Sequence, residues 1–578
     1  MTIMNILQKS LRELLDFCGK EYPDNQFLSF IDGESSYTYR TFHSKVEEIA
    51  SLLNRYGIRP GEKVGLLAQN MPNWVVSYFA TVGYGMITVP MLPDFSESEV
   101  RHILKHSGSK ALFISERLLS KLSEKAKERL RLIIRCDDFE VIKSDTTANT
   151  DKEQQGESAV ELYPAQSIKS EDLAAIIYTS GTTGSSKGVM LTHKNLCANL
   201  WSAQQLRPSF ASDIWLSILP LSHTLESSLS MMLPMLAGAS VYYIDKAPTP
   251  SILMKALSKV RPTTMLSVPL IIEKIYKSAV LPKFRSNAIL RFLYSIPVTR
   301  KVLNKKAGKM LMEKFGGRIR FFGIGGAKLD TNVERFLLEA HFPYAIGYGL
   351  TETSPLIAGA IPSKVRLGST GPIVEGVTVK LLNKDPETGI GEICVKGDNV
   401  MSGYFDNPET TASVFTPDGW FRTHDLGMFD KDGWLYIKGR SSTTIIGPSG
   451  ENIYPEEIES VINSHDMVSE SIVTKRKGKL IALVHFDQEK LKKKLSQTSD
   501  EYQEKFENLK KEVLEYVNEK VSKFSRLSEI KEQLEEFEKT ATKKIKRYKY
   551  NEDKDSDKKN TRKLLFSAEV CDAPATRS

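Results

Sequence analysis

Hydrophobic positions in the first 135 residues alternate between helical and strand-like spacing. Ser44 to Leu53 has the spacing of an amphipathic helix, and Lys63 to Ala68 is a short apolar run that predicts a strand. Trp74 to Val82 is apolar almost throughout, which is typical of a buried helix, and Ala111 to Ile114 predicts a second short strand. Such alternation predicts a layered α/β architecture.

The pattern changes twice farther along the chain. Residues 137–170 are polar and predict a surface loop or linker, after which the α/β pattern resumes at Leu173 and continues to about Gly439. From Ser441 onwards the chain predicts one compact α/β segment, with Lys479 to Phe486 as a strand, and then a long charged helix. Apolar residues share one face of that helix: Phe506, Leu509, Val513, Tyr516, Val517 and Val521.

These changes predict an α/β protein with two domains and a tail. We expect a large N-terminal domain of several subdomains over residues 1–440 and a small α+β C-terminal domain over 441–550. Residues 551–578 are polar and predict a disordered tail. The length of 578 residues supports this division, because one hydrophobic core rarely serves so long a chain.

Composition limits the cellular environments and the binding partners that can be expected for this chain. The five cysteines are scattered without CxxC spacing, so neither a disulfide framework nor a structural zinc site is expected, and a reducing cytoplasm is the simplest location. No apolar run approaches the roughly 20 residues of a membrane-spanning helix. The net charge of +8 permits contact with anionic lipid, coenzyme A or nucleic acid without indicating one of them.

The segment LAAIIYTSGTTGSSKGVMLTH, residues 173–193, has the chemistry of a phosphate-binding loop. An apolar run suited to a buried strand leads into ten residues rich in Gly, Ser and Thr, with one lysine, Lys187. Glycines allow close backbone approach, and hydroxyl groups and an ammonium group can bind phosphate oxygens. The segment is not a Walker A loop, because Lys187 precedes Gly188 and no Gly-x4-Gly-Lys-Ser/Thr frame fits.

Further motifs accompany this loop in a fixed order. They are GGA at 325–327, GYGLTET at 347–353, STGP at 369–372, GWFRTHDLG at 419–427, GR at 439–440, GENIYPEEIE at 450–459 and KTATKKIKR at 539–547. Together with YTSGTTGSSKG at 178–188 this set resembles the adenylate-forming superfamily, which includes acyl-CoA synthetases, carrier-protein-loading adenylation domains and firefly luciferase. Within it the chain looks most like bacterial-type long-chain fatty acyl-CoA ligases.

The resemblance implies a nucleotide site. Tyr348 matches the aromatic residue that stacks on adenine, Asp425 the aspartate that binds the ribose hydroxyls, and Arg440 a residue that binds ribose or phosphate. Glu352 matches the magnesium-associated glutamate, and the resemblance implies that Thr351 contacts the α-phosphate. The other residues implied in nucleotide or coenzyme binding are Thr179, Ser180, Gly181, Thr182, Thr183, Lys187, Gly325, Gly326, Ala327, Gly349, Gly450 and Glu451.

The resemblance also implies residues that act on the carboxylate. Lys544 matches the C-terminal lysine that contacts the carboxylate and the α-phosphate during adenylation, and His223 the gate-like residue near the fatty-acid carboxylate, with Glu226 as a weaker candidate beside it. A lone histidine next to an apolar segment is equally well explained as a structural residue. The chain departs from the family pattern at His424 and Lys543, where glycine is usual, and at the hinge position Ser442.

The implied activity is ATP-dependent ligation of a fatty acid to CoA through an acyl-adenylate, with Mg²⁺ as cofactor and a small C-terminal domain that moves between two half-reactions. Transfer to an acyl carrier protein and a non-catalytic acyl- or nucleotide-binding role remain as alternatives. The basic stretch from Lys274 to Met312, with its apolar segment LRFLYSIP, suggests peripheral contact with the inner face of a membrane, although ordinary helix packing explains it too. No nucleic-acid-binding module is recognised.

Overall fold

The computed structural model describes residues 4–145, 167–180, 186–246, 249–284, 287–447, 451–476, 478–494, 499–540 and 544–550. The chain divides into two compact units, Met1–Thr444 (unit 1) and Ile445–Ser578 (unit 2). Both mix helices and strands, so the predicted α/β class with a large N-terminal and a small C-terminal part is confirmed. The predicted boundary after residue 440 and the movement of the smaller part stay predictions.

One eight-stranded sheet of unit 1, sheet A, has six parallel strands at its centre. The antiparallel strands β15 and β2 form its edges. In spatial order its strands are β15 (Leu356–Gly359), β14 (Tyr344–Gly349), β13 (Phe321–Ile324), β12 (Thr264–Ser267), β10 (Ile214–Ser217), β11 (Ser240–Tyr243), β1 (Gln26–Phe30) and β2 (Tyr37–Thr38).

The second eight-stranded sheet, sheet B, joins the N-terminal α/β region to the predicted phosphate loop. Its strands are β18 (Gly403–Tyr404), β9 (Ser186–Thr192), β8 (Leu173–Ser180), β4 (Ile87–Pro90), β3 (Lys63–Leu67), β5 (Ala111–Ile114), β6 (Leu132–Arg135) and β7 (Val141–Ser144). The strands predicted at Lys63, Ala111 and Leu173 are confirmed. The prediction of a continuous loop over 137–170 is wrong at β7, which pairs antiparallel with β6; residues 146–166 lie outside the described part.

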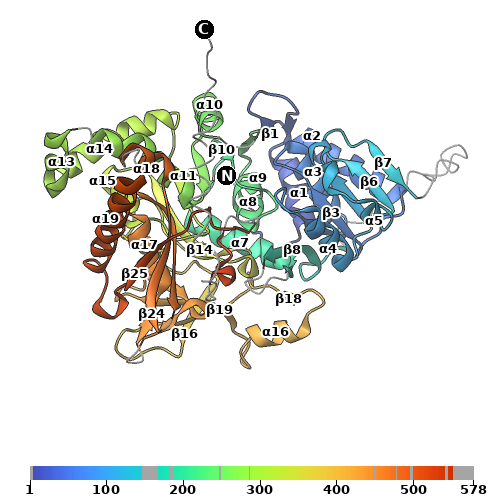
Figure 1. The fold of residues 1–578 in the computed structure, drawn as a ribbon. Helices are drawn as coiled ribbons and strands as arrows, with labels where there is room; N and C mark the ends of the chain where they lie inside the picture. Colours follow the sequence, from blue (N-terminus) through green and yellow to red (C-terminus); the bar gives the residue numbers. More distant parts are fainter. Residues whose placement is uncertain are drawn as a thin grey trace, which may run out of the picture. The chain divides into compact units, whose positions relative to one another are not determined.

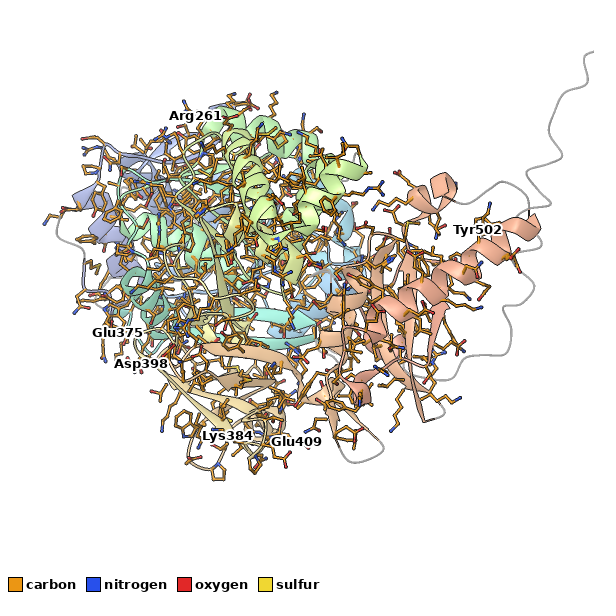
Figure 2. All side chains as sticks on the ribbon, turned by 90° about the vertical axis from the view of Figure 1, so that its left-hand side faces the viewer. Arg261, Glu375, Lys384, Asp398, Glu409 and Tyr502 are labelled. Carbon is orange, nitrogen blue, oxygen red and sulfur yellow. The ribbon has the colours of Figure 1, made fainter. Side chains whose placement is uncertain are left out.

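A smaller antiparallel sheet completes unit 1. Its strands follow the order β16 (Val377–Leu382), β17 (Gly391–Gly397), β19 (Phe421–Phe429) and β20 (Leu435–Arg440). Figure 2 places Lys384, after β16, and Glu409 at the opposite end of unit 1 from Arg261.

Helices of unit 1 connect and cover these sheets (Figure 1). They are α1 (Leu11–Glu21), α2 (Tyr39–Arg55), α3 (Pro72–Val82), α4 (Glu97–Ser107), α5 (Glu124–Lys127), α7 (His193–Leu206), α8 (Thr224–Glu226), α9 (Leu233–Leu236), α10 (Pro250–Val260), α11 (Pro269–Ile275), α12 (Leu281–Phe284), α13 (Ala288–Ser295), α14 (Pro297–Lys314), α15 (Thr331–Glu339) and α16 (Pro408–Val414). Helix α4 illustrates how local sequence sets the ends. Ser96 and Glu99 form a capping box at its start, and Gly108 ends it with a positive φ of 66°.

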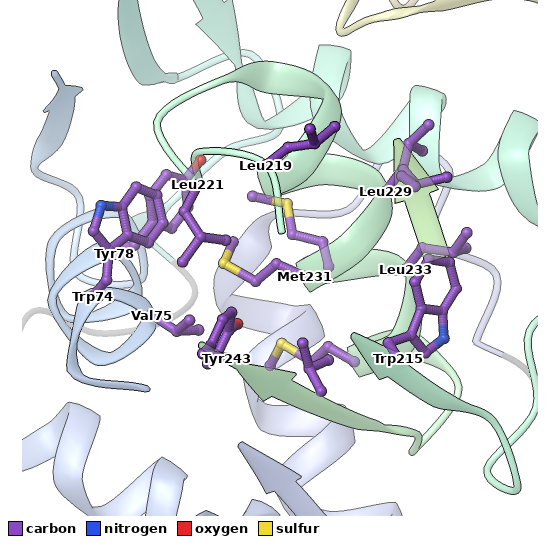
Figure 3. Packing of buried hydrophobic residues seen from close by; sticks show 14 of the residues in the cluster. Trp74, Val75, Tyr78, Trp215, Leu219, Leu221, Leu229, Met231, Leu233 and Tyr243 are labelled. Carbon is purple, nitrogen blue, oxygen red and sulfur yellow. The ribbon is translucent and has the colours of Figure 1, made fainter. Parts of the chain in front are cut away.

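The main core of unit 1 is continuous between the N-terminal helices and sheet A. Figure 3 shows Trp74, Val75 and Tyr78 of α3 near Tyr243 of β11, with Trp215 of β10 farther along. The rings of Trp74 and Tyr78 stack with centroids 5.4 Å apart. The prediction that Trp74 to Val82 is a buried helix is confirmed, since every residue of α3 is buried.

Unit 2 has its own hydrophobic core around a three-stranded sheet. The strands are β23 (Val468–Arg476), β24 (Lys479–Phe486) and β25 (Glu529–Glu532), and β21 (Ile445–Ile446) pairs separately with β22 (Asn452–Ile453). Its helices are α17 (Pro455–Asn463), α18 (Gln488–Lys494) and α19 (Ser499–Asn518). On the predicted apolar face of α19, Phe506, Leu509, Val513 and Val517 are buried.

Across the described part of the chain, no helix is both long enough and apolar enough to cross a membrane.

Candidate nucleotide-binding site

The carboxyl ends of parallel strands in sheet A carry several of the predicted residues. His223 follows β10, Gly325 to Ala327 follow β13, and Tyr348 stands near the end of β14. A Cβ placed on Gly325 would lie 3.7 Å from the carbonyl oxygen of Gly347, so the GGA and GYGLTET segments are in direct contact. Ligands of open parallel sheets bind beyond the carboxyl ends of the strands, and this edge of sheet A is therefore the candidate site.

The loop that follows Tyr348 is held rigidly by buried hydrogen bonds. A Cβ on Gly349 would lie only 1.7 Å from the carbonyl oxygen of Pro355, so the backbone approach there requires glycine. The side chain of Asn399 donates to the carbonyl groups of Thr353 and Leu356, both at 2.9 Å. Such fixed backbone is suited to holding Thr351 and Glu352 in one orientation.

Glu352 and Lys187 meet around Tyr404. The Tyr404 hydroxyl donates to Glu352 Oε1 at 2.9 Å, and Lys187 Nζ lies 5.2 Å from the centroid of the Tyr404 ring. Burial and then the Glu352 carboxylate raise the pKa of Tyr404, which keeps its hydroxyl a donor. The structure thus brings together the lysine of the YTSGTTGSSKG segment and the glutamate of the GYGLTET segment.

Asp425 forms the second cluster, with Tyr348 and Arg440. The Tyr348 hydroxyl donates to Asp425 Oδ2 at 2.8 Å, and Arg440 Nε lies 3.0 Å from Asp425 Oδ1. Asp425 and Arg440 face each other because β19 and β20 pair antiparallel at this point. Burial and the neighbouring carboxylate raise the pKa of Tyr348. The cluster offers a flat ring, a carboxylate and a guanidinium group, which suit a base, a diol and a phosphate.

His424 adopts the backbone conformation that a glycine would adopt freely. Its φ is +58°, in the left-handed region, which explains in physical terms why glycine is usual at this position. Its Nδ1 lies 3.0 Å from Oε1 of the buried Glu392, which Arg422 also contacts at 2.7 Å. The departure therefore leaves Asp425 in place at the cost of a strained residue beside it.

His223 lies at the start of α8, where its Nδ1 accepts a hydrogen bond from the backbone N–H of Leu225 at 3.3 Å. Glu226 is fully buried one turn on and accepts a 2.5 Å hydrogen bond from Ser217 Oγ. Burial raises the pKa of Glu226 to about 7. The capping contact gives His223 a structural role, and the structure leaves its predicted contact with a carboxylate as a prediction.

The remaining predicted residues fall in three groups. Thr179 pairs with Lys187 and Ser180 with Ser186 across β8 and β9, so Lys187 belongs to a strand and not to the loop before it. Lys544 is exposed in unit 2, and its backbone is hydrogen-bonded to Thr540. The backbone carbonyl of Glu451 accepts a hydrogen bond from the backbone N–H of Gly447. Residues outside the described part are Gly181, Thr182, Thr183, Gly450 and Lys543.

Glu352 fits the single-carboxylate role expected of a magnesium ligand that is shared with phosphates. Mg²⁺ is commonly held by one or two carboxylates together with substrate phosphate oxygens. Within the described residues there is no group of three His, Cys, Asp or Glu side chains that could enclose a metal ion by itself. This donor set suits a metal that arrives with a nucleotide.

Two residues of the site were not predicted. Tyr404 reaches Glu352 because β18 pairs with β9, and Asn399 supports the loop from 353 to 356. Both lie in a segment without a recognised motif, GDNVMSGYFDNP. Nothing local indicates their roles. Tyr404 is placed by strand pairing across more than two hundred residues, and Asn399 acts through hydrogen bonds to residues 43 and 46 positions earlier in the chain.

Comparison with known proteins agrees with this geometry. The family described as AMP-binding enzyme matches residues 16–405, and its C-terminal domain matches residues 442–554. The peroxisomal long chain acyl-CoA synthetase 7 of Arabidopsis thaliana is 30% identical over 80% of this chain and 70% of its own length. The 4-coumarate–CoA ligase 1 of the same plant is 29% identical over 76% of each protein.

Among solved structures, the o-succinylbenzoate CoA synthetase of Bacillus subtilis in complex with ATP and magnesium has the same fold. Its TM-score is 0.71 at 24% identity, over 93% of this chain and 98% of that one. The family match covers more than half of the sequence, and the relatives are acyl-CoA ligases. The chain therefore belongs to the AMP-binding enzyme family, the adenylate-forming enzymes.

Proposed function

We propose that the chain is an AMP-forming ligase that joins a long-chain fatty acid to coenzyme A. The observation that carries the proposal is the placement of Lys187, Tyr404 and Glu352 in the same unit as the cluster of Tyr348, Asp425 and Arg440. One group offers charge for phosphates, and the other offers partners for a nucleoside. Long-chain acyl-CoA synthetases among the relatives support the choice of acid.

In the first half-reaction a carboxylate oxygen of the acid attacks the α-phosphorus of ATP. The bond from that phosphorus to the bridging oxygen breaks, and pyrophosphate leaves with the electron pair. Lys187 offsets charge on the phosphates, while Asp425 and Arg440 fix the ribose. Mg²⁺ held by Glu352 would neutralise further phosphate charge when bound. We assign Lys544 the role of a cation for the same step.

In the second half-reaction the CoA thiolate attacks the acyl carbonyl carbon. The bond between that carbon and the AMP oxygen breaks, which yields the thioester and AMP. We assign Gly450 and Glu451 to the pantetheine arm. No covalent enzyme intermediate is required, because adenylation has already activated the acyl group.

Product analysis over a panel of acids tests the proposal. Saturated acids from octanoate to stearate, together with 4-coumarate, are supplied with Mg·ATP and either CoA or acyl carrier protein. We expect acyl-CoA and AMP with a long-chain optimum. A preference for 4-coumarate would overturn the choice of acid, and turnover with carrier protein alone would overturn the choice of acceptor. The relatives that act on 4-coumarate make the aromatic acid a necessary member of the panel.

A further inference from the structure

A pair of consecutive helices in unit 1, α13 and α14, presents large apolar side chains to the outside. Ile289 is 72% exposed, Phe292 66%, Val298 72% and Val302 67%. Every other exposed large apolar side chain in the described part of the chain is at most 55% exposed. None of the residues of α13 is buried. We call these four side chains, together with the exposed lysines of α14, the α13–α14 surface.

The same helix pair is strongly basic. Residues 287–314 contain a single acidic residue, Glu313, which is exposed. Of the cations, Arg300 pairs with Glu339 at 2.8 Å. No carboxylate of a described residue lies within ion-pair distance of the other six, which are all exposed: Arg291, Lys301, Lys305, Lys306, Lys309 and Lys314.

Spacing places apolar and basic residues next to each other on α14. Val298, Val302, Lys305 and Lys309 follow at intervals of four, three and four residues, so they form one stripe along the helix. The valines occupy the first two turns and the lysines the next two. On α13, Ile289 and Phe292 are three residues apart and share a face.

Contacts of Tyr294 and Asn304 hold the helix pair in place. The ring of Tyr294 stacks on Phe284 with centroids 4.6 Å apart, and its hydroxyl donates to Asn304 Oδ1 at 3.0 Å. Asn304 in turn donates to Glu339 Oε2 at 2.8 Å. The exposed apolar residues therefore belong to a fixed element, which Figure 1 shows at the margin of unit 1 beyond α15.

We propose that the α13–α14 surface docks on an anionic lipid bilayer. The four apolar side chains would enter the boundary between headgroups and acyl chains, while the lysines extend their stems along apolar surface and bring ammonium groups to lipid phosphates. An acidic protein would satisfy the cations but would also need an apolar groove for four protruding side chains. This inference goes beyond the proposed function and does not depend on it, since vesicle binding needs neither ATP nor CoA.

Co-sedimentation of the full chain with vesicles tests the proposal. One set of vesicles is phosphatidylcholine alone, and the other contains phosphatidylglycerol as well. We expect binding to the anionic vesicles that weakens with salt. Ile289→Gln/Phe292→Gln/Val298→Gln/Val302→Gln should weaken it at least about tenfold through lost apolar insertion. Lys301→Gln/Lys305→Gln/Lys306→Gln should weaken it about a hundredfold at low salt, from the attraction of each lysine to the surface.

Matched controls separate this surface from general effects. Phe210→Gln changes a 49% exposed aromatic residue elsewhere in unit 1, and Lys125→Gln/Lys384→Gln/Lys431→Gln removes three exposed charges elsewhere; both should bind as wild type does. The proposal would be overturned if the wild-type protein does not bind anionic vesicles, or if a control loses as much binding as its matched variant. A change of oligomeric state without vesicles, caused by the four glutamine substitutions at the apolar positions, would also overturn it, because it would indicate that this surface lies between copies of the chain.

Discussion

The hydroxyl of Tyr404 donates a 2.9 Å hydrogen bond to Oε1 of Glu352, across a site assembled from strands far apart in the sequence. Tyr404 stands on β18, whose partner β9 carries Lys187, so one tyrosine links the predicted phosphate lysine to the predicted magnesium ligand. This hydrogen bond fixes one oxygen of the Glu352 carboxylate.

Tyr404→Phe should slow adenylation while leaving the fold intact. The variant keeps the ring beside Lys187 and removes only the donor to Glu352. A hydrogen bond to a charged group contributes about 1.5–3 kcal/mol, so we expect a fall of roughly ten- to a hundredfold in the rate of acyl-adenylate formation. Trapping the adenylate with hydroxylamine measures that rate. Tyr548→Phe, at a 48% exposed tyrosine, is the control, and equal rates in all three proteins would refute a role for Tyr404.

Gly349→Ala should disrupt the loop that carries Glu352. The added Cβ would lie 1.7 Å from a backbone oxygen, which cannot move without the loop. We expect the unfolding free energy to fall by about 3 kcal/mol, measured by denaturant titration. Gly347→Ala is the matched control two residues away, because its Cβ would meet Leu356 at an ordinary 3.6 Å. Similar losses in both variants would show that the close approach at Gly349 is not what matters.

The backbone conformation of His424 should determine how substitutions at this position change the unfolding free energy. With φ at +58°, a β-branched side chain is strained, and His424→Val should lose about 1–2 kcal/mol of unfolding free energy. His424→Gly relieves the strain but loses the contact with Glu392, so a change below about 1 kcal/mol is expected. Thermal or denaturant unfolding distinguishes the two. A valine variant as stable as the glycine variant would contradict this explanation.

Glu226 should make stability depend on pH between about 4.5 and 7. Burial raises its pKa to about 7 in the folded state, so over this range the folded protein binds more protons than the unfolded chain. The unfolding free energy therefore falls as pH rises through the range, by at most about 3 kcal/mol from this group. Glu226→Gln should remove that part of the slope in denaturant titrations between pH 5 and 8.

Glu334 supplies an internal control for that experiment. Burial raises its pKa to about 7 as well, and it titrates in both proteins, so the difference between their slopes isolates Glu226. Parallel pH profiles for wild type and Glu226→Gln would show that Glu226 keeps an ordinary pKa in the folded protein.

The local hydrophobic pattern was sufficient to predict the strands that are buried in a core. The predicted strands at Ala111 to Ile114 and Lys479 to Phe486 coincide with β5 and β24, because short, mostly apolar runs mark buried strands. β7 was missed because its four residues, VIKS, are short and half polar and are stabilised by pairing with β6.

The site shows the same limit. Motifs indicated Glu352, Asp425 and Lys187 one by one, but their grouping depends on tertiary pairing. Tyr404 could not be recognised, since its importance comes from the register of β18 on β9.

Acid-dependent exchange of pyrophosphate into ATP, measured without CoA, tests the central claim most directly. We predict that Mg²⁺ and a long-chain fatty acid together support exchange, that omission of the acid abolishes it, and that Asp425→Asn and Glu352→Gln reduce it strongly. If the protein binds ATP but no acid in the panel supports exchange, it does not form an acyl-adenylate, and a non-catalytic acyl- or nucleotide-binding role replaces the ligase.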